Sequence, residues 1–100
     1  MEIYVGVACE ADNNIPKAFG GRENFFFTRF EIDVEDGTVY GRQTVRCHDD
    51  NFVAMAEENM IKKFVYDTMP AEYEEGLKAL GIELFPGKTG NYQQAALSVV

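Results

Sequence analysis

The chain has 100 residues, 46% of them hydrophobic, so one domain over residues 1–100 with a modest core is expected. Nine basic against seventeen acidic residues give a formal charge of −8, which favours solubility and opposes binding to a nucleic-acid backbone. No apolar run approaches the roughly 20 residues of a membrane helix, and no basic region opens the chain as in a secretory signal. We therefore expect a cytoplasmic protein with neither nucleic-acid nor membrane partners.

The first half of the chain predicts three strands. Ile3–Ala8 is apolar on both faces, which is typical of a central strand. A polar loop follows from Glu10 to Asn24, and loops of this length are usually functional or disordered. Phe25–Glu35 alternates as a second strand, and Asp36-Gly37 then predicts a tight turn into a third strand that ends near Cys47.

The Asp36-Gly37 turn also predicts how the second and third strands are aligned. A two-residue loop would place Val34 opposite Val39 and Glu31 opposite Arg42. The second pair joins opposite charges across the ladder, which supports this register.

The second half alternates between helices and strands. The expected elements are a helix capped by Asp49 or Asp50 and running to Lys62, a strand at 64–66, a helix from Thr68 or Met69 to Gly81, a strand at 82–85, and a last helix capped by Asn91. Two helices carry apolar stripes that should face the sheet, namely Phe52, Met55, Ala56 and Met60 in the first and Tyr73, Leu77 and Leu80 in the second. The order β-β-β-α-β-α-β-α predicts a mixed five-stranded sheet with right-handed crossovers.

A family resemblance rests on five segments taken in order: Ile3–Ala8, Ile15–Gly20, Phe27–Val39, Leu77–Leu84 and Thr89–Ala95. Together they resemble the dinitrogenase iron–molybdenum cofactor biosynthesis family, of the NifX and NifB C-terminal type, over nearly the whole chain. The resemblance implies a ribonuclease H-like three-layer α/β/α domain with a five-stranded mixed sheet. It also implies a role in binding or carrying iron–molybdenum–sulfur clusters or their precursors.

The chain departs from the family pattern at three places. Ala18 stands where many relatives have His, which removes one candidate ligand. The segment 47–50, Cys-His-Asp-Asp, replaces a Gly/His-rich stretch after the third strand. The segment 66–70 replaces a glycine turn after the fourth strand.

Cys47 and His48 are the candidate metal ligands. They should end the third strand just before a helix N-terminus, and thiolate and imidazole both bind soft transition metals. The alternative is a small buried Cys beside a surface His. Cys9 ends the first strand and is expected to have a packing role. If the third strand runs antiparallel to the first, the two thiols lie at opposite edges of the sheet.

A basic, glycine-containing loop is the candidate cofactor-binding segment. Gly20 and Gly21 would let backbone N–H groups converge on an anionic cluster, and Lys17 and Arg22 would add positive charge. The alternative is an ordinary turn, with Phe19 anchoring the loop on the core.

The sequence thus predicts a non-enzymatic binding or carrier protein for an iron–molybdenum–sulfur type of cluster or its precursor. Its partners would be the proteins that donate or accept the cluster. A first alternative is an interaction module of the same family that has lost cluster binding. In that case Phe25 and Phe27, on the more polar face of the hairpin, would form the contact patch.

A second alternative is a metal-dependent hydrolase on the ribonuclease H-like fold. Such enzymes use carboxylates at strand ends and on a helix to hold two metal ions. The residues available for these roles are Glu10 or Asp12, Glu57 or Glu58, and Asp67.

Overall fold

The computed structural model describes residues 1–100, and its elements follow the order that the sequence predicts. They are β1 (Glu2–Cys9), β2 (Phe25–Asp33), β3 (Val39–Cys47), α1 (Phe52–Glu58), β4 (Ile61–Val65), α2 (Ala71–Ala79), β5 (Glu83–Phe85) and α3 (Tyr92–Leu97). The predicted α/β class and mixed five-stranded sheet are confirmed. None of the helices combines the length and the hydrophobicity that crossing a membrane would require.

The sheet has the strand order β3-β2-β1-β4-β5. β2 is antiparallel to both of its neighbours, while β4 and β5 are parallel to β1. Four strands, β1, β3, β4 and β5, therefore run in one direction, and their C-terminal ends lie together along one border of the sheet. We call this border the carboxyl edge; the last residues of the four strands there are Cys9, Cys47, Val65 and Phe85.

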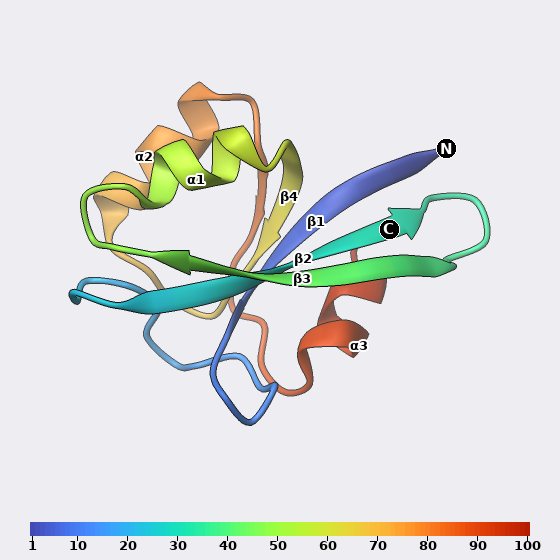
Figure 1. Ribbon diagram of the computed structural model, residues 1–100, viewed down its shortest axis with the longest axis horizontal. Coiled ribbons are helices and arrows are strands. Elements are labelled where there is room, and N and C mark those ends of the chain that lie inside the picture. Colours follow the sequence, from blue (N-terminus) through green and yellow to red (C-terminus); the bar gives the residue numbers. More distant parts are fainter.

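Helices cover both faces of the sheet. The Phe27 ring packs on Phe52 of α1 with centroids 5.9 Å apart, whereas the Phe30 ring packs on Tyr92 of α3 at 5.0 Å. Because side chains alternate along a strand, Phe27 and Phe30 point to opposite faces of β2. The domain therefore has three layers, with α1 and α2 on one side of the sheet and α3 on the other (Figure 1).

The contact patch that the interaction-module alternative assigns to Phe25 and Phe27 is not at the surface. Their side chains are 5% and 0% exposed, because α1 and α2 cover the face of β2 that carries them. Charged neighbours in the same strand made this face look polar. Of these neighbours, Arg29 lies over the Tyr4 ring, with its guanidinium carbon 4.4 Å from the ring centroid.

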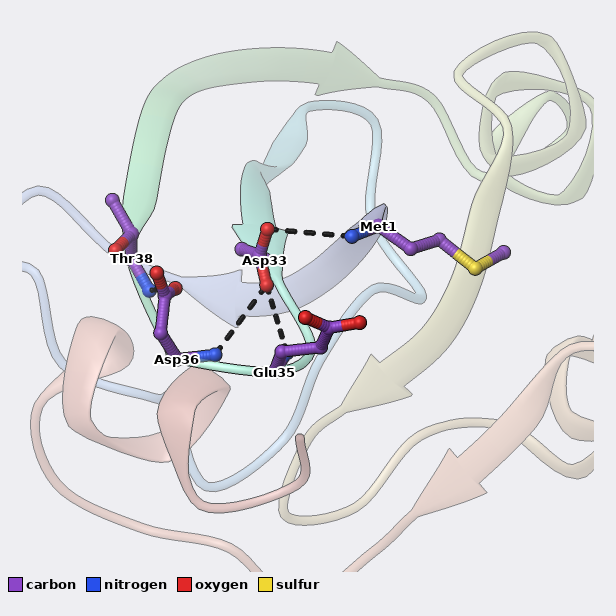
Figure 2. Close-up of polar contacts among 5 residues, drawn as sticks. All are labelled: Met1, Asp33, Glu35, Asp36 and Thr38. Carbon is purple, nitrogen blue, oxygen red and sulfur yellow. Dashed lines mark hydrogen bonds and ion pairs between the residues drawn. The ribbon is translucent and has the colours of Figure 1, made fainter.

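The predicted register of the hairpin is also wrong. Phe30 lies opposite Arg42 and Glu31 opposite Gly41, and the pairing shifts before Ile32 meets Val39. The cause is Asp33, whose carboxylate accepts the backbone N–H groups of Glu35 and Asp36 (Figure 2). Asp33 N–H also donates to the Thr38 carbonyl, so the loop is longer than two residues. The hydrogen bonds from these backbone N–H groups, together with the N-terminal ammonium, lower the pKa of Asp33.

Two of the predicted helices are shorter than expected. α1 ends at Glu58 because the chain reverses at Asn59 and Met60, where Met60 adopts a φ of 56° and leaves its side chain 61% exposed. Met60 therefore does not belong to the buried stripe. Leu80 lies just past the end of α2 and is exposed too. For the last helix, the predicted Asn91 cap is confirmed, since its side chain accepts the N–H groups of two residues in α3.

The long loop from Glu10 to Asn24 is tied to the carboxyl edge. Phe19 is 2% exposed, and its ring packs edge-on against Phe25 and Phe52, with centroids 5.0 Å apart in each case. Backbone bonds of 2.9 Å run from Ile15 N–H to Gly90 and from Phe19 N–H to Thr68. In Figure 1 this blue segment passes below the sheet to the start of β2. Phe19 therefore anchors the loop on the core, as in the alternative of an ordinary turn.

Candidate functional site

Two segments singled out in the sequence meet at the carboxyl edge. They are the loop 17–24 and the segment 47–51 that follows β3. The exposed His48 joins them, because its Nδ1 lies 2.7 Å from the carbonyl oxygen of Glu23. Its backbone N–H donates to the Asn51 side chain at 2.7 Å. Asn51 occupies the N-cap position of α1, but its side chain makes no hydrogen bond to the helix. Neither Asp49 nor Asp50 caps that helix, contrary to expectation.

Tyr73 of α2 makes a second link between the same segments. Its hydroxyl accepts the N–H of Gly21 at 3.2 Å and donates to the carboxylate of Asp49. Burial, reinforced by the hydrogen bond to Asp49, raises the pKa of Tyr73 to about 12. The phenol is therefore a neutral donor at physiological pH and holds the loop against the start of the α1 segment.

Glycine is needed at the two positions of the loop for different structural reasons. Both adopt left-handed backbone conformations, with φ values of 75° and 70° for Gly20 and Gly21. A Cβ on Gly20 would lie 2.3 Å from Cε2 of Tyr73, so this glycine also makes room for the ring. A Cβ on Gly21 would approach only Pro70, at 3.9 Å. The N–H of Gly21 is already used by Tyr73, so it does not face an open anion site.

The basic residues of the loop differ in their partners. Arg22 forms an exposed ion pair with Glu10 at 3.7 Å, so part of its charge is neutralised. The Lys17 ammonium makes no ion pair, and the Lys17 carbonyl accepts the N–H and the hydroxyl of Thr68 at 3.2 and 2.6 Å. These backbone bonds fix the base of the loop and leave one free cation on it.

A hollow of about 360 Å³ lies under this loop. Its lining comes from β1, the loop and the start of β2: Cys9, Glu10, Ala11, Pro16, Phe19, Arg22, Asn24, Phe25 and Phe26. It places Arg22 beside apolar surface at the carboxyl edge, where ligands of open α/β sheets commonly bind.

Cys47 lies in the core beneath His48. It is 0% exposed, and burial raises the pKa of its thiol to about 12. Because the side chains of consecutive residues point to opposite sides of a strand end, the thiol faces inward while the imidazole remains in solvent. The structure therefore separates the two sequence-predicted metal ligands, and Cys47 stays a protonated thiol.

The two cysteines lie at the same edge of the sheet, because β3 runs parallel to β1 and the condition for opposite edges is not met. Cys9 pairs with Phe26 and Cys47 with Phe25, so they flank the start of β2 from either side. Because consecutive residues of a strand alternate, the thiols face opposite sides of the sheet. The Sγ of Cys9 lies 3.0 Å from the Thr28 hydroxyl, and burial raises the pKa of Cys9 as well.

The carboxylates considered for a hydrolase do not gather. Glu10, Asp12 and Asp67 follow strands at the carboxyl edge, whereas Glu57 and Glu58 lie at the end of α1, next to the start of β4 at the opposite edge. No three His, Cys, Asp or Glu side chains form a group that would hold a metal ion.

Sequence reasoning missed Tyr73 and Glu23 as parts of this site. Tyr73 looked like one member of an apolar stripe, and only its hydroxyl hinted at a polar partner. Glu23 contributes a backbone carbonyl, for which no sequence signal exists.

Comparison with known proteins finds no matching family model and no matching curated protein. A solved structure, the crystal structure of PH0822, is similar to this chain with a TM-score of 0.76 and 20% sequence identity. The similarity covers 97% of this chain and 88% of the PH0822 chain. At this level of identity, the similarity shows a shared fold and nothing further.

Proposed function

We propose that this chain is a cytoplasmic, non-enzymatic carrier for an anionic metal–sulfur cluster, of the iron–molybdenum type that the family resemblance implies. The observation that carries the proposal is the position of His48. A carbonyl oxygen only accepts, so the ring nitrogen beside Glu23 must donate, and a neutral ring then has its lone pair on Nε2. Metal-binding histidines commonly have this arrangement, in which the second nitrogen donates to a carbonyl.

The loop 17–24 would hold the cluster with charge and hydrogen bonds rather than with further metal bonds. Lys17 offers an unpaired ammonium, and Arg22 borders the hollow beneath the loop. Cys47 is assigned to packing, since ligation would require its deprotonation and exposure. A cargo held by one imidazole and by electrostatic contacts is released readily, which suits transfer from a donor protein to an acceptor.

We also infer that the domain has the ribonuclease H-like form of the three-layer α/β/α architecture. The strand order, the antiparallel β2 at the second position and the helices on both faces support this inference. Phe25 and Phe27 are buried, so they do not form the contact patch of the alternative interaction module.

The test is an oxygen-free titration with an iron–molybdenum–sulfur cluster, read by visible absorbance and by the metal retained after gel filtration. His48→Ala should lose saturable binding, because it removes the proposed ligand. Cys47→Ala and Cys9→Ala should both keep it. The cysteine variants are matched controls, since each removes a buried thiol from one face of the same edge.

Loss of binding in Cys47→Ala but not in Cys9→Ala would show that the loop opens to expose Cys47 as a ligand. Retention of metal by His48→Ala at the wild-type level would refute the assignment of His48. Absence of retained metal in the wild-type protein would refute cluster carriage.

A further inference from the structure

A second hollow, of about 410 Å³, lies on the α3 face of the carboxyl edge. Its lining comes from the end of β1, the loop that follows, β2, β3 and α3: Cys9, Glu10, Ala11, Asn13, Phe26, Thr28, Arg42, Gln43, Thr44 and Tyr92. It adjoins the hollow under the loop through Cys9, Glu10, Ala11 and Phe26, and neither His48 nor Gly21 lines either hollow. Its volume falls in the range of small-molecule sites.

The floor of this hollow carries no charged side chain. Thr28 is 2% exposed, and its hydroxyl is hydrogen-bonded to the thiol of Cys9 at 3.0 Å. Beside this pair lie Phe26, which is half-buried, and the Tyr92 ring, which packs edge-on against Phe30. The floor therefore offers apolar contact area to a ligand, while the Thr28 hydroxyl and the Cys9 thiol are already bonded to each other.

The rim carries one uncompensated cation. Arg42 forms no ion pair, although the chain has seventeen acidic residues, and it donates a single hydrogen bond of 3.3 Å to the Gln93 side chain. A guanidinium has five N–H donors, so most of them remain available on a group that Gln93 holds in place. The exposed Thr44 lies opposite Thr28, and its hydroxyl has no partner in the chain. The carboxylate of Glu10 is paired with Arg22 at 3.7 Å.

We propose that this hollow is a binding site for a small organic carboxylate. Arg42 takes the carboxylate through paired N–H donors with help from the Thr44 hydroxyl, and the apolar body of the ligand lies against Phe26 and Tyr92. Guanidinium and carboxylate match in a two-bond geometry, which gives both strength and orientation. The site adjoins the hollow under the loop but differs from it in its cation, since Arg42 lines this hollow and Arg22 lines the other.

The test is a titration of isotope-labelled protein with benzoate, followed by the amide signals in two-dimensional nitrogen–proton NMR spectra. Benzoate combines a carboxylate with an apolar ring, whereas acetate, run in parallel, has only the charged group. The signals of Asn13, Gln43 and Thr44 should shift and saturate with benzoate, and acetate should bind more weakly. The dissociation constant should rise about ten-fold or more in Arg42→Gln, as expected for loss of a charge-assisted pair.

Arg46→Gln is the matched control. Arg46 is exposed on the same face of β3 as Arg42, yet it does not line the hollow. It should change the dissociation constant by less than about two-fold. Equal weakening in both variants would show general charge attraction and overturn the proposal, as would the absence of saturable shifts in the wild-type protein. Shifts confined to His48 and Gly21 would also overturn it, and none of these outcomes bears on cluster carriage.

Discussion

Tyr73 combines two roles that are usually carried by different residues. Its ring stacks on Phe25 with centroids 6.0 Å apart and an interplanar angle of 22°, so it belongs to the aromatic core between the sheet and the helices. Its hydroxyl binds Gly21 and Asp49 and so fixes the two segments of the candidate site. A buried phenol needs such partners, because an unmet hydroxyl in the core is costly.

Tyr73→Phe should lower the free energy of unfolding by about 1–2 kcal/mol at pH 9, because it removes both hydrogen bonds. Folding raises the pKa of Tyr73 from 10.0 to about 12. The unfolded chain therefore loses this proton first, and the stability contributed by the phenol is complete below pH 10 and lost as the pH rises to about 12. Urea unfolding of wild type and variant at several pH values measures the difference, which should shrink over this interval.

Tyr4→Phe is the control for this prediction. Tyr4 keeps its ring beside Arg29 in the variant, and its hydroxyl makes no hydrogen bond in the chain. Its stability at pH 9 should match that of the wild type. An equal loss in Tyr4→Phe, or a Tyr73→Phe difference that does not change with pH, would contradict the role given to the Tyr73 hydroxyl.

At the scale of elements, α1 and α2 pack closely at one glycine. Gly76 lies in the middle of α2, where a Cβ would be 2.8 Å from Cγ2 and 3.1 Å from Cγ1 of Val53 in α1. Glycine usually weakens a helix by about 1 kcal/mol relative to alanine. Here its absent side chain lets the two helices approach over the aromatic core, and Val53 is too stiff at χ1 to move aside.

Gly76→Ala should therefore destabilise the domain by about 1–2 kcal/mol, although alanine is the better helix former. Chemical denaturation of Gly76→Ala, Val53→Ala and the double variant forms the test. The double variant should be at least as stable as Val53→Ala alone, because the shortened residue makes room for the new methyl group. A stabilising Gly76→Ala would show that the helices separate without cost.

At the scale of the whole molecule, charge works against the fold. The formal charge is −8, and the structure forms only three ion pairs, all of which include at least one well-exposed group. Exposed pairs of this kind contribute little. The unbalanced carboxylates repel one another across a small surface, and stability therefore comes from the buried aromatic and aliphatic core.

Added salt should stabilise the protein at neutral pH. Raising the ionic strength from a low value to about 0.15 M shortens the Debye length to about 8 Å and screens the repulsion. The free energy of unfolding should rise by on the order of 1 kcal/mol. Urea titrations in sodium chloride and in potassium chloride should give the same increase. A decrease with salt would mean that attractive pairs dominate.

The sequence by itself determined the order and type of the elements. Strand alternation, helix spacing, the Asn91 cap and the Phe19 anchor are local signals, which depend on residues within a few positions of one another. The prediction that the loop 17–24 and His48 belong to a binding site also rested on local composition. The structure brings these two segments together at one edge, although it separates Cys47 from His48.

Only the tertiary structure decided the register, the exposure and the geometry of the site. Asp33 set the hairpin loop by binding two amides, and a second helical layer buried Phe25 and Phe27 on a face that looked polar. The insertion of β2 between β1 and β3 brought both cysteines to one edge. These features depend on which strands pair and which surfaces are covered, and such choices join residues far apart in the chain, where no local pattern records them.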